Sequence, residues 1–234
     1  LEAYHVDEVL LVNTEQYATG YVQNTYVQRT AFDYGEGWSG IRIEEGQEVS
    51  YVLSGISGTV TSGAKPTIEI QLMGRDDWPH NVEVLVGGSG GLRVLNTVLF
   101  DDYTTHTLNE EIEWTDISAD GNMTVKIRAL GVSGGNDLIS TNYIKLQFPQ
   151  SFDMGGASSK TFILDENTDN KSYVEIVNKP NGVQLWDITD PQAPLKIGYN
   201  SVGNDLNTIV PNTNVKRTIL AVSNFSTPLS ITQI

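Results

Sequence analysis

The sequence predicts an all-β protein, in which a jelly-roll-like β-sandwich is followed by a small all-β unit. Apolar and polar residues alternate along several short segments, a pattern that places one face of a strand in a core. Segments rich in Gly, Ser, Asn and Asp separate these runs, and only 18% of the residues are charged, which is typical of strand-and-turn proteins. At 234 residues the chain can bury a core that needs no disulfide or metal.

Four segments of the predicted sandwich show the alternation most clearly. Residues 9–12, which precede them, are too few to distinguish a strand from one helical turn. The alternating apolar positions are Ile68, Ile70 and Leu72; Val82, Val84 and Val86; Met123, Val125, Ile127 and Ala129; and Ile144, Leu146 and Phe148. Turns are predicted at residues 55–63, 75–81, 87–91, 116–122 and 131–136. This spacing favours an antiparallel sandwich.

A domain junction is predicted near Pro149, because residues 150–160 lose the alternation and contain Gly155-Gly156. The sandwich then comprises residues 1–150 and the small unit residues 151–234. Strands of the small unit are predicted at residues 162–164, 173–177, 183–188, 195–199 and 218–222.

The formal net charge of −15 argues against nucleic acid and anionic membrane surfaces as partners. No apolar stretch is long enough for a membrane-spanning helix. The acidity fits the solubility of an exported protein, or loops that bind calcium. Asp165, Asn167 and Asp169 offer oxygen ligands at alternating positions, but the segment lacks the Gly and the closing Glu of an EF-hand loop. Calcium is the one cofactor that these residues suggest.

No catalytic residue is predicted in this chain. The absence of Cys excludes a thiol nucleophile, Cys-bound zinc and disulfides. Two Gly-x-Ser-x-Gly segments, centred on Ser89 and Ser133, join strand to strand, whereas a hydrolase nucleophile elbow leads into a helix. Adjacent acidic pairs point to opposite faces of a strand and make poor acid–base pairs. We expect His80, in a turn before a strand, to be a surface or capping residue, while a metal site assembled in the tertiary structure stays open.

Four aromatic residues fall in predicted turns or at strand edges, namely Tyr34, Trp38, Trp78 and Tyr103. Exposed rings at such places can stack on sugars, as in carbohydrate-binding sandwiches. The alternative is that they cap the ends of the sandwich core.

The segment Asn181 to Leu195 is the least expected by chance. It predicts a turn at Asn181-Gly182, a strand and a stop, because proline removes backbone donors from the sheet. We expect Trp186, which follows two apolar strand residues, to be part of the core. The positions that define the motif are Trp186, Asp187, Thr189, Asp190, Pro191 and Pro194.

An apolar strand running into W-D-I-T-D-P-x-x-P resembles the segment just upstream of the catalytic domain in gingipain-like cysteine peptidases of the type IX secretion system. Weaker similarities to the family lie at residues 32–38, 142–148 and 217–222 with Thr227-Pro228. Asn142 stands where the family usually has Asp, so the similarity at residues 142–148 is looser. The W-D-I-T-D-P segment also resembles a repeat unit of some bacterial β-propellers, although one copy cannot close a propeller.

The resemblance implies the non-catalytic N-terminal β region of a secreted or cell-surface peptidase, with its catalytic His and Cys in a downstream domain. Leu1 follows no initiator methionine, and we expect the chain to be a piece of that larger protein. The implied partners are the downstream domain of the same chain, secretion-system components and cell-surface polysaccharide. The implied location is the periplasm, the outer membrane or the cell surface.

Two other functions stay open, a free-standing carbohydrate-binding sandwich on the cell surface and a purely structural or adhesive β module. If a catalytic domain normally covers the small unit, that unit should expose an apolar patch. The expected members of the patch are Ile197, Tyr199 and Phe225.

Overall fold

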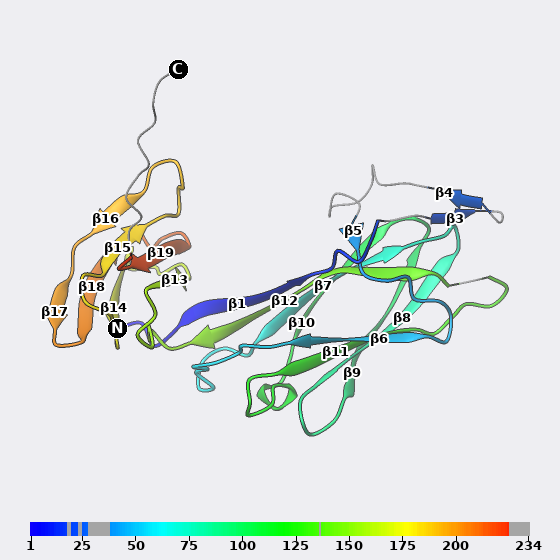
Figure 1. Ribbon diagram of the computed structural model, residues 1–234, viewed down its shortest axis with the longest axis horizontal. Helices are drawn as coiled ribbons and strands as arrows, with labels where there is room; N and C mark the ends of the chain where they lie inside the picture. Colours follow the sequence, from blue (N-terminus) through cyan, green and yellow to red (C-terminus); the bar gives the residue numbers. More distant parts are fainter. Residues whose placement is uncertain (18–19, 23–24, 28–37, 136, 225–234) are drawn as a thin grey trace, which may run out of the picture. The chain divides into compact units, whose positions relative to one another are not determined.

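The computed structural model describes residues 1–17, 20–22, 25–27, 38–135 and 137–224, which form two compact units (Figure 1). The predicted all-β class is confirmed, because these residues are arranged in antiparallel sheets with one short 3₁₀ helix, η2 (Trp114–Asp116). No helix in the described ranges is long and apolar enough to cross a membrane. Tyr34, Phe225 and most of residues 32–38 lie outside the described residues.

The sandwich unit comprises Glu8–Ser57 and Ala64–Phe148. One sheet has the order β10-β7-β12-β1, from β1 (His5–Val12), β7 (Thr67–Gly74), β10 (Thr105–Glu111) and β12 (Ile139–Gln150). The second has the order β6-β11-β8-β9, from β6 (Glu48–Leu53), β8 (Pro79–Gly87), β9 (Arg93–Asp101) and β11 (Met123–Ala129). Two short pairs complete the unit, β2 (Gln16–Tyr17) with β5 (Trp38–Ser39) and β3 (Gly20–Val22) with β4 (Thr25–Val27). Residues 9–12 are therefore strand.

Apolar side chains from the two sheets form one core, as the alternation predicts. Ile70 lies opposite Ile144 in the first sheet, and Val84 lies opposite Ile127 in the second. All four are fully buried and belong to one cluster. Each buried aliphatic side chain contributes about 1.5 to 3 kcal/mol by leaving water, so this core is the main source of the unit's stability.

The C-terminal unit comprises Leu1–Asp7, Gly58–Gly63 and the chain from Pro149 onward. Its larger sheet contains the start of β1 and four further strands in the order β13-β19-β15-β16: β13 (Ser159–Leu164), β15 (Gln184–Asp187), β16 (Leu195–Ile197) and β19 (Arg217–Val222). Its smaller sheet has the order β14-β18-β17, from β14 (Lys171–Ile176), β17 (Asn200–Val202) and β18 (Asp205–Pro211). A second core, separate from that of the sandwich, lies within this unit.

Two segments assigned to the sandwich from the sequence are grouped with the C-terminal unit in the structure. Val6 pairs with Ile163, and the His5 ring packs edge-on against Phe162 with 4.9 Å between centroids. Residues 58–63 pair with the end of β12, where Ser151 donates its N–H to the Gly58 carbonyl. Strand pairing across long sequence separations creates this grouping, which local alternation does not reveal.

The prediction that Trp186 belongs to the core is wrong. Successive residues of a strand face opposite sides, and Leu185 is fully buried while Trp186 is half-buried. The outer face of the indole lies beneath the Lys196 ammonium group, 5.8 Å from the ring centroid. The turn before the strand is as expected, because Gly182 adopts φ 75°, a conformation that glycine favours.

We expect Leu185→Ala to lower the free energy of unfolding by about 2 to 5 kcal/mol, because it opens a cavity in the core. Trp186→Ala should cost less, since the indole is only half-buried and lies outside the core cluster. Urea denaturation of the two variants checks this order. A larger loss for Trp186→Ala would contradict the placement of the indole on the outer face.

Candidate functional site

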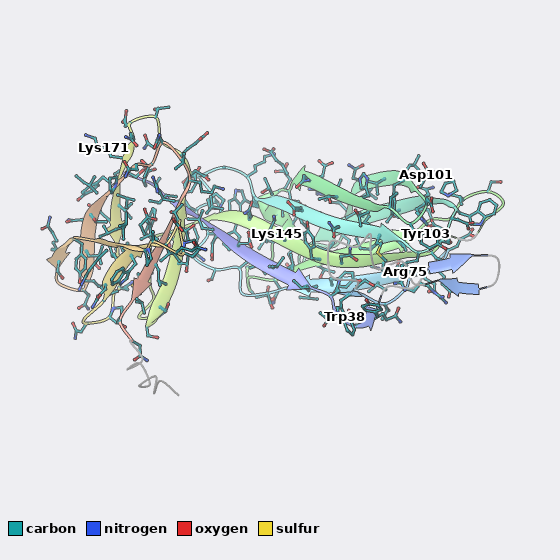
Figure 2. All side chains as sticks on the ribbon, turned by 90° about the horizontal axis from the view of Figure 1, so that it is seen from above. Trp38, Arg75, Asp101, Tyr103, Lys145 and Lys171 are labelled. Atoms are coloured by element: carbon teal, nitrogen blue, oxygen red, sulfur yellow. The ribbon has the colours of Figure 1, made fainter. Side chains whose placement is uncertain are left out.

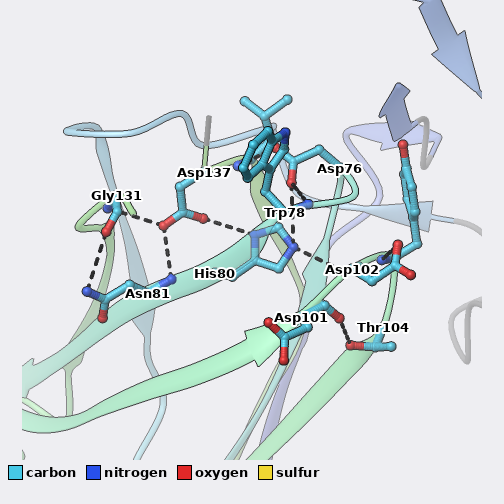
Figure 3. A network of polar contacts seen from close by, with 11 residues as sticks. Asp76, Trp78, His80, Asn81, Asp101, Asp102, Thr104, Gly131 and Asp137 are labelled. Atoms are coloured by element: carbon cyan, nitrogen blue, oxygen red, sulfur yellow. Dashed lines mark hydrogen bonds and ion pairs between the residues drawn. The ribbon is translucent and has the colours of Figure 1, made fainter. Parts of the chain in front are cut away.

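A buried cluster of ionisable side chains lies toward one end of the sandwich unit, where Figure 2 labels Arg75, and Figure 3 shows the polar contacts of Asp76, His80 and Asp137. Arg75 and Asp76 follow β7, His80 lies at the start of β8, and Asp137 precedes β12. Each of these side chains is at most 2% exposed. Buried charges are costly unless they are paired, so their arrangement determines whether this end of the unit is stable.

The His80 ring is bonded on both nitrogens. Nδ1 is 3.0 Å from the Asp137 carboxylate, and Nε2 is 3.0 Å from the Asp102 carbonyl. Both partners are oxygen acceptors, so either ring nitrogen can donate to its partner when it carries a proton. The other Asp137 oxygen accepts the backbone N–H groups of Asn81 and Gly131. Asp137 thereby joins the segment before β12 to the start of β8.

Asp76 accepts two backbone N–H groups, from Trp78 at 3.0 Å and from Leu138 at 3.2 Å. Its carboxylate also lies 3.8 Å from His80 Nε2. Burial nevertheless raises the pKa of Asp76 to about 6, against the opposing effect of the two N–H groups and His80. Proton binding at this carboxyl therefore changes within a mildly acidic range.

The neighbouring backbone is shaped around this cluster. Gly74, the last residue of β7, lies against the Asp102 carbonyl and the His80 ring, so no side chain fits there. The Arg75 guanidinium donates to the hydroxyls of Ser39 at 3.2 Å and Ser140 at 2.6 Å. The cluster thus ties together β5, β7, β8 and β12.

A His–Asp pair is a common acid–base arrangement, but here both members are fully buried. A substrate cannot touch either group in this conformation. The geometry is that of a buried structural cluster, which holds strands and loops together. The prediction that His80 is a surface or capping residue is therefore wrong. No local pattern indicates this burial, because the partner of His80, Asp137, lies 57 residues away in the sequence.

The other two histidines, His5 and His106, also pack against or bond to neighbouring side chains. His5 lies in the C-terminal unit, where Nε2 is 3.0 Å from Gln150 Oε1 and burial lowers its pKa. His106 stacks on Phe100 with 5.6 Å between ring centroids.

Both Gly-x-Ser-x-Gly segments connect strand to strand. Ser89 lies between β8 and β9, and Ser133 lies between β11 and β12. Both residues are exposed, and neither is followed by a helix. The elbow geometry that positions a catalytic serine therefore does not occur at either place.

The three calcium candidates each lie in the C-terminal unit, with partners of their own. Asp165 pairs with Lys216 at 3.2 Å, and the Asn167 amide donates to Glu2 at 2.9 Å. Asn167 Oδ1 accepts the backbone N–H of Asp169. Within the part of the chain that the structure describes, no three His, Cys, Asp or Glu residues gather closely enough to hold a metal ion.

Two of the predicted stacking residues present open rings. Trp38 and Trp78 are 46% and 44% exposed, and Trp38 packs edge-on against Tyr17. Tyr103 is half-buried. Figure 2 places Trp38, Arg75 and Tyr103 toward the same end of the sandwich unit.

The W-D-I-T-D-P segment forms a tight, internally bonded turn. Asp187 lies 3.5 Å from Arg217 and accepts the N–H of Thr189, whose hydroxyl accepts the N–H of Thr218. Asp190 accepts the N–H of Gln192 at 3.0 Å. Pro191 and Pro194 lie in the exposed segment that follows the end of β15. The motif therefore anchors β15 to β19.

The expected apolar patch differs from the one observed. Ile197 is buried at 8% exposure, because it faces the core opposite Leu185, and Tyr199 is half-buried against the same core. Among the described residues, the large apolar side chains of the C-terminal unit that are exposed are Leu1, Tyr173, Val177, Leu195, Val202, Ile209 and Val215.

Fold and site together define a two-unit all-β protein whose sandwich unit contains a buried cluster formed by Arg75, Asp76, His80 and Asp137. No family model matches the sequence. No curated protein matches it either.

Among solved structures, this chain is similar to the dimeric latent PorU from Porphyromonas gingivalis, with a TM-score of 0.69 and 10% identity. The match covers 95% of this chain and 20% of that protein, so the chain spans about a fifth of its length. This likeness establishes a shared fold.

Two carbohydrate-binding modules match over a smaller part. A CBM36 module in complex with calcium and xylotriose has a TM-score of 0.34 and 12% identity, covering 60% of this chain and 98% of the module. CBM35 from Cellvibrio japonicus Abf62 has a TM-score of 0.37 and 14% identity, covering 62% and 99%. Likenesses this weak carry no functional argument.

The raised pKa of Asp76 predicts an unusual pH dependence of stability. The folded state holds this proton up to about pH 6, whereas the unfolded chain releases it near 3.8. The stabilisation is therefore complete below about pH 3.8 and is lost as the pH rises through about 6, a change of roughly 1 to 2 kcal/mol between pH 4.5 and 6. Denaturation of the wild type at several pH values should therefore show a slope: the free energy of unfolding falls as the pH rises from 4.5 to 6.

Asp76→Asn, which cannot titrate, should remove this slope even though His80 and Asp137 remain beside it. Asp120→Asn, at an exposed carboxylate, serves as the matched control and should retain it. An unchanged slope in Asp76→Asn would assign the pH dependence to other groups.

Proposed function

We propose that this chain is the non-catalytic accessory β region of a gingipain-like peptidase linked to type IX secretion, where it supports or positions the catalytic domain. The observation that carries the proposal is the fold likeness to latent PorU, since it extends over 95% of this chain. The W-D-I-T-D-P segment supports it independently, because its resemblance to that family lies in residues that anchor β15 to β19.

The proposal places the protein outside the cytoplasm, in the periplasm, in the outer membrane or at the cell surface. Its partners are the catalytic domain of the same chain, secretion-system components and surface polysaccharide. The exposed apolar residues of the C-terminal unit support a covering domain, because Leu195 and Val202 are each more than half exposed.

The chain itself is proposed to lack catalysis. Thiol chemistry needs a cysteine, and the sequence has none. Ser89 and Ser133 lie in exposed hairpin loops, and the buried His80 is already bonded on both nitrogens. These features leave no activated nucleophile in the described residues.

A surface carbohydrate-binding module is the second candidate function. Trp38 and Trp78 favour it, because large exposed rings at the end of a sandwich provide stacking surface. In that case sugar binding should depend on these two rings.

We expect the purified chain to show no peptidase activity on fluorogenic peptide substrates, because it lacks an activated nucleophile. Ser89→Ala and Ser133→Ala serve as controls. Turnover in the wild type that either substitution abolishes would contradict the proposal.

We also expect the melting midpoint to rise when a gingipain-like catalytic domain is attached after Ile234, because covering exposed apolar side chains stabilises the unit. Differential scanning calorimetry of the chain with and without that domain measures the effect. An unchanged midpoint would indicate a self-sufficient module and favour the carbohydrate-binding function.

A further inference from the structure

A shallow hollow of about 360 Å³ lies in the C-terminal unit, over the sheet β14-β18-β17. It is large enough to hold one or more sugar rings. The lining comes from all three strands and from the two residues between β16 and β17: Tyr173, Gly198, Tyr199, Asn200, Asn207, Thr208 and Ile209.

One side of the hollow is apolar and held in place. Tyr173 and Ile209 lie opposite each other in neighbouring strands and are 38% and 59% exposed. The Tyr173 hydroxyl donates to the Glu175 carboxylate at 3.2 Å, two residues along the same strand. This bond aligns the phenol with the strand and leaves ring surface in contact with solvent.

The other side offers unused hydrogen-bonding groups. Asn200 lies directly opposite Asn207 in the register of β17 and β18. Neither side-chain amide has a hydrogen-bond partner among the residues that the structure describes, although each offers two donors and an acceptor. Two adjacent unbonded amides can together bind vicinal hydroxyl groups.

The surrounding residues are fixed before any ligand arrives. The Tyr199 hydroxyl donates to the Val183 carbonyl at 2.6 Å, and the Thr208 hydroxyl donates to the Gly198 carbonyl at 2.7 Å. Gly198 leaves the space above it open, since a Cβ there would meet no atom within 4 Å. A rigid, preformed surface lowers the entropy cost of binding.

No Asp, Glu, Lys, Arg or His is among the residues that line this hollow, although the chain carries a net charge of −15. Glu175, which accepts the Tyr173 hydroxyl, lies opposite Asn207 beside the hollow, so an anionic ligand would meet a carboxylate and no counter-charge among the lining residues. Neutral sugars combine apolar C–H faces, which stack on rings, with hydroxyls that bond to amides.

We propose that this hollow binds a neutral sugar unit of a polysaccharide, with Tyr173 as the stacking ring and with Asn200 and Asn207 as hydroxyl-binding residues. The site is separate from the rings at the end of the sandwich unit. It does not depend on the proposed accessory role, which concerns the catalytic domain.

Isothermal titration of the chain with maltotriose, cellotriose, xylotriose and trigalacturonate at millimolar concentrations tests the proposal. At least one neutral trisaccharide should bind, and the charged one should bind more weakly. In ¹H–¹⁵N NMR of the wild type, the shifts should centre on Tyr173, Asn200 and Asn207. This measurement locates the site even if a variant fails to fold.

Tyr173→Ala and Asn207→Ala should each weaken binding about tenfold. Gly198→Leu should abolish it by filling the open space. Tyr143→Ala and Asn204→Ala, which change the same residue types outside the hollow, should bind as the wild type does.

Two results would overturn the proposal. One is binding that is lost in Trp38→Ala or Trp78→Ala and retained in Tyr173→Ala. The other is the absence of any binding and of any shift at the hollow with all four sugars. The second result leaves the accessory role intact, because that role is tested by the effect of the catalytic domain on the melting midpoint.

Discussion

Burial of one apolar face of every long central strand is the constraint on which the structure depends. In the sandwich unit, alternate residues of β7, β8, β11 and β12 meet between two sheets and leave almost no exposed surface. Because strand side chains alternate with a period of two, the opposite faces are free to carry charge. On β11 the outward residues Lys126 and Arg128 use this freedom and pair with Glu48 and Glu83 on the neighbouring strands.

The buried cluster of Arg75, Asp76, His80 and Asp137 depends on that core. Four ionisable side chains are buried where β7, β8 and the loop before β12 meet, and each charge has a partner or several N–H groups. Buried pairs of this kind seldom add much stability compared with apolar packing, but losing one partner is expensive. The buried cluster therefore specifies how the loops close the end of the sandwich, while the apolar core supplies the stability.

The C-terminal unit differs from the sandwich unit in the size of its core and in its exposed side chains. It is small, and the 13 buried apolar residues of its core all lie between Phe152 and Ala221. Residues 1–7 and 58–63 belong to the same unit but add none of these core residues. Its outward faces retain exposed apolar and amide side chains. The two proposals use different members of this set: a covering domain would contact Leu195 and Val202, and a sugar would contact Tyr173, Asn200 and Asn207.

The sequence by itself determined the all-β class, the strands that carry strong alternation and the position of the turn at Gly182. These are local properties, since a period of two and a residue that adopts positive φ can be recognised within a few positions. Polar strands such as β10, where Leu108 is the one buried residue, carry too little alternation to be recognised. Only the tertiary structure brought Asp137 to His80, turned Trp186 outward and Ile197 inward, and placed Asn200 beside Asn207. Those outcomes depend on which strands pair and in which register, and both are decided by contacts between residues far apart in the chain.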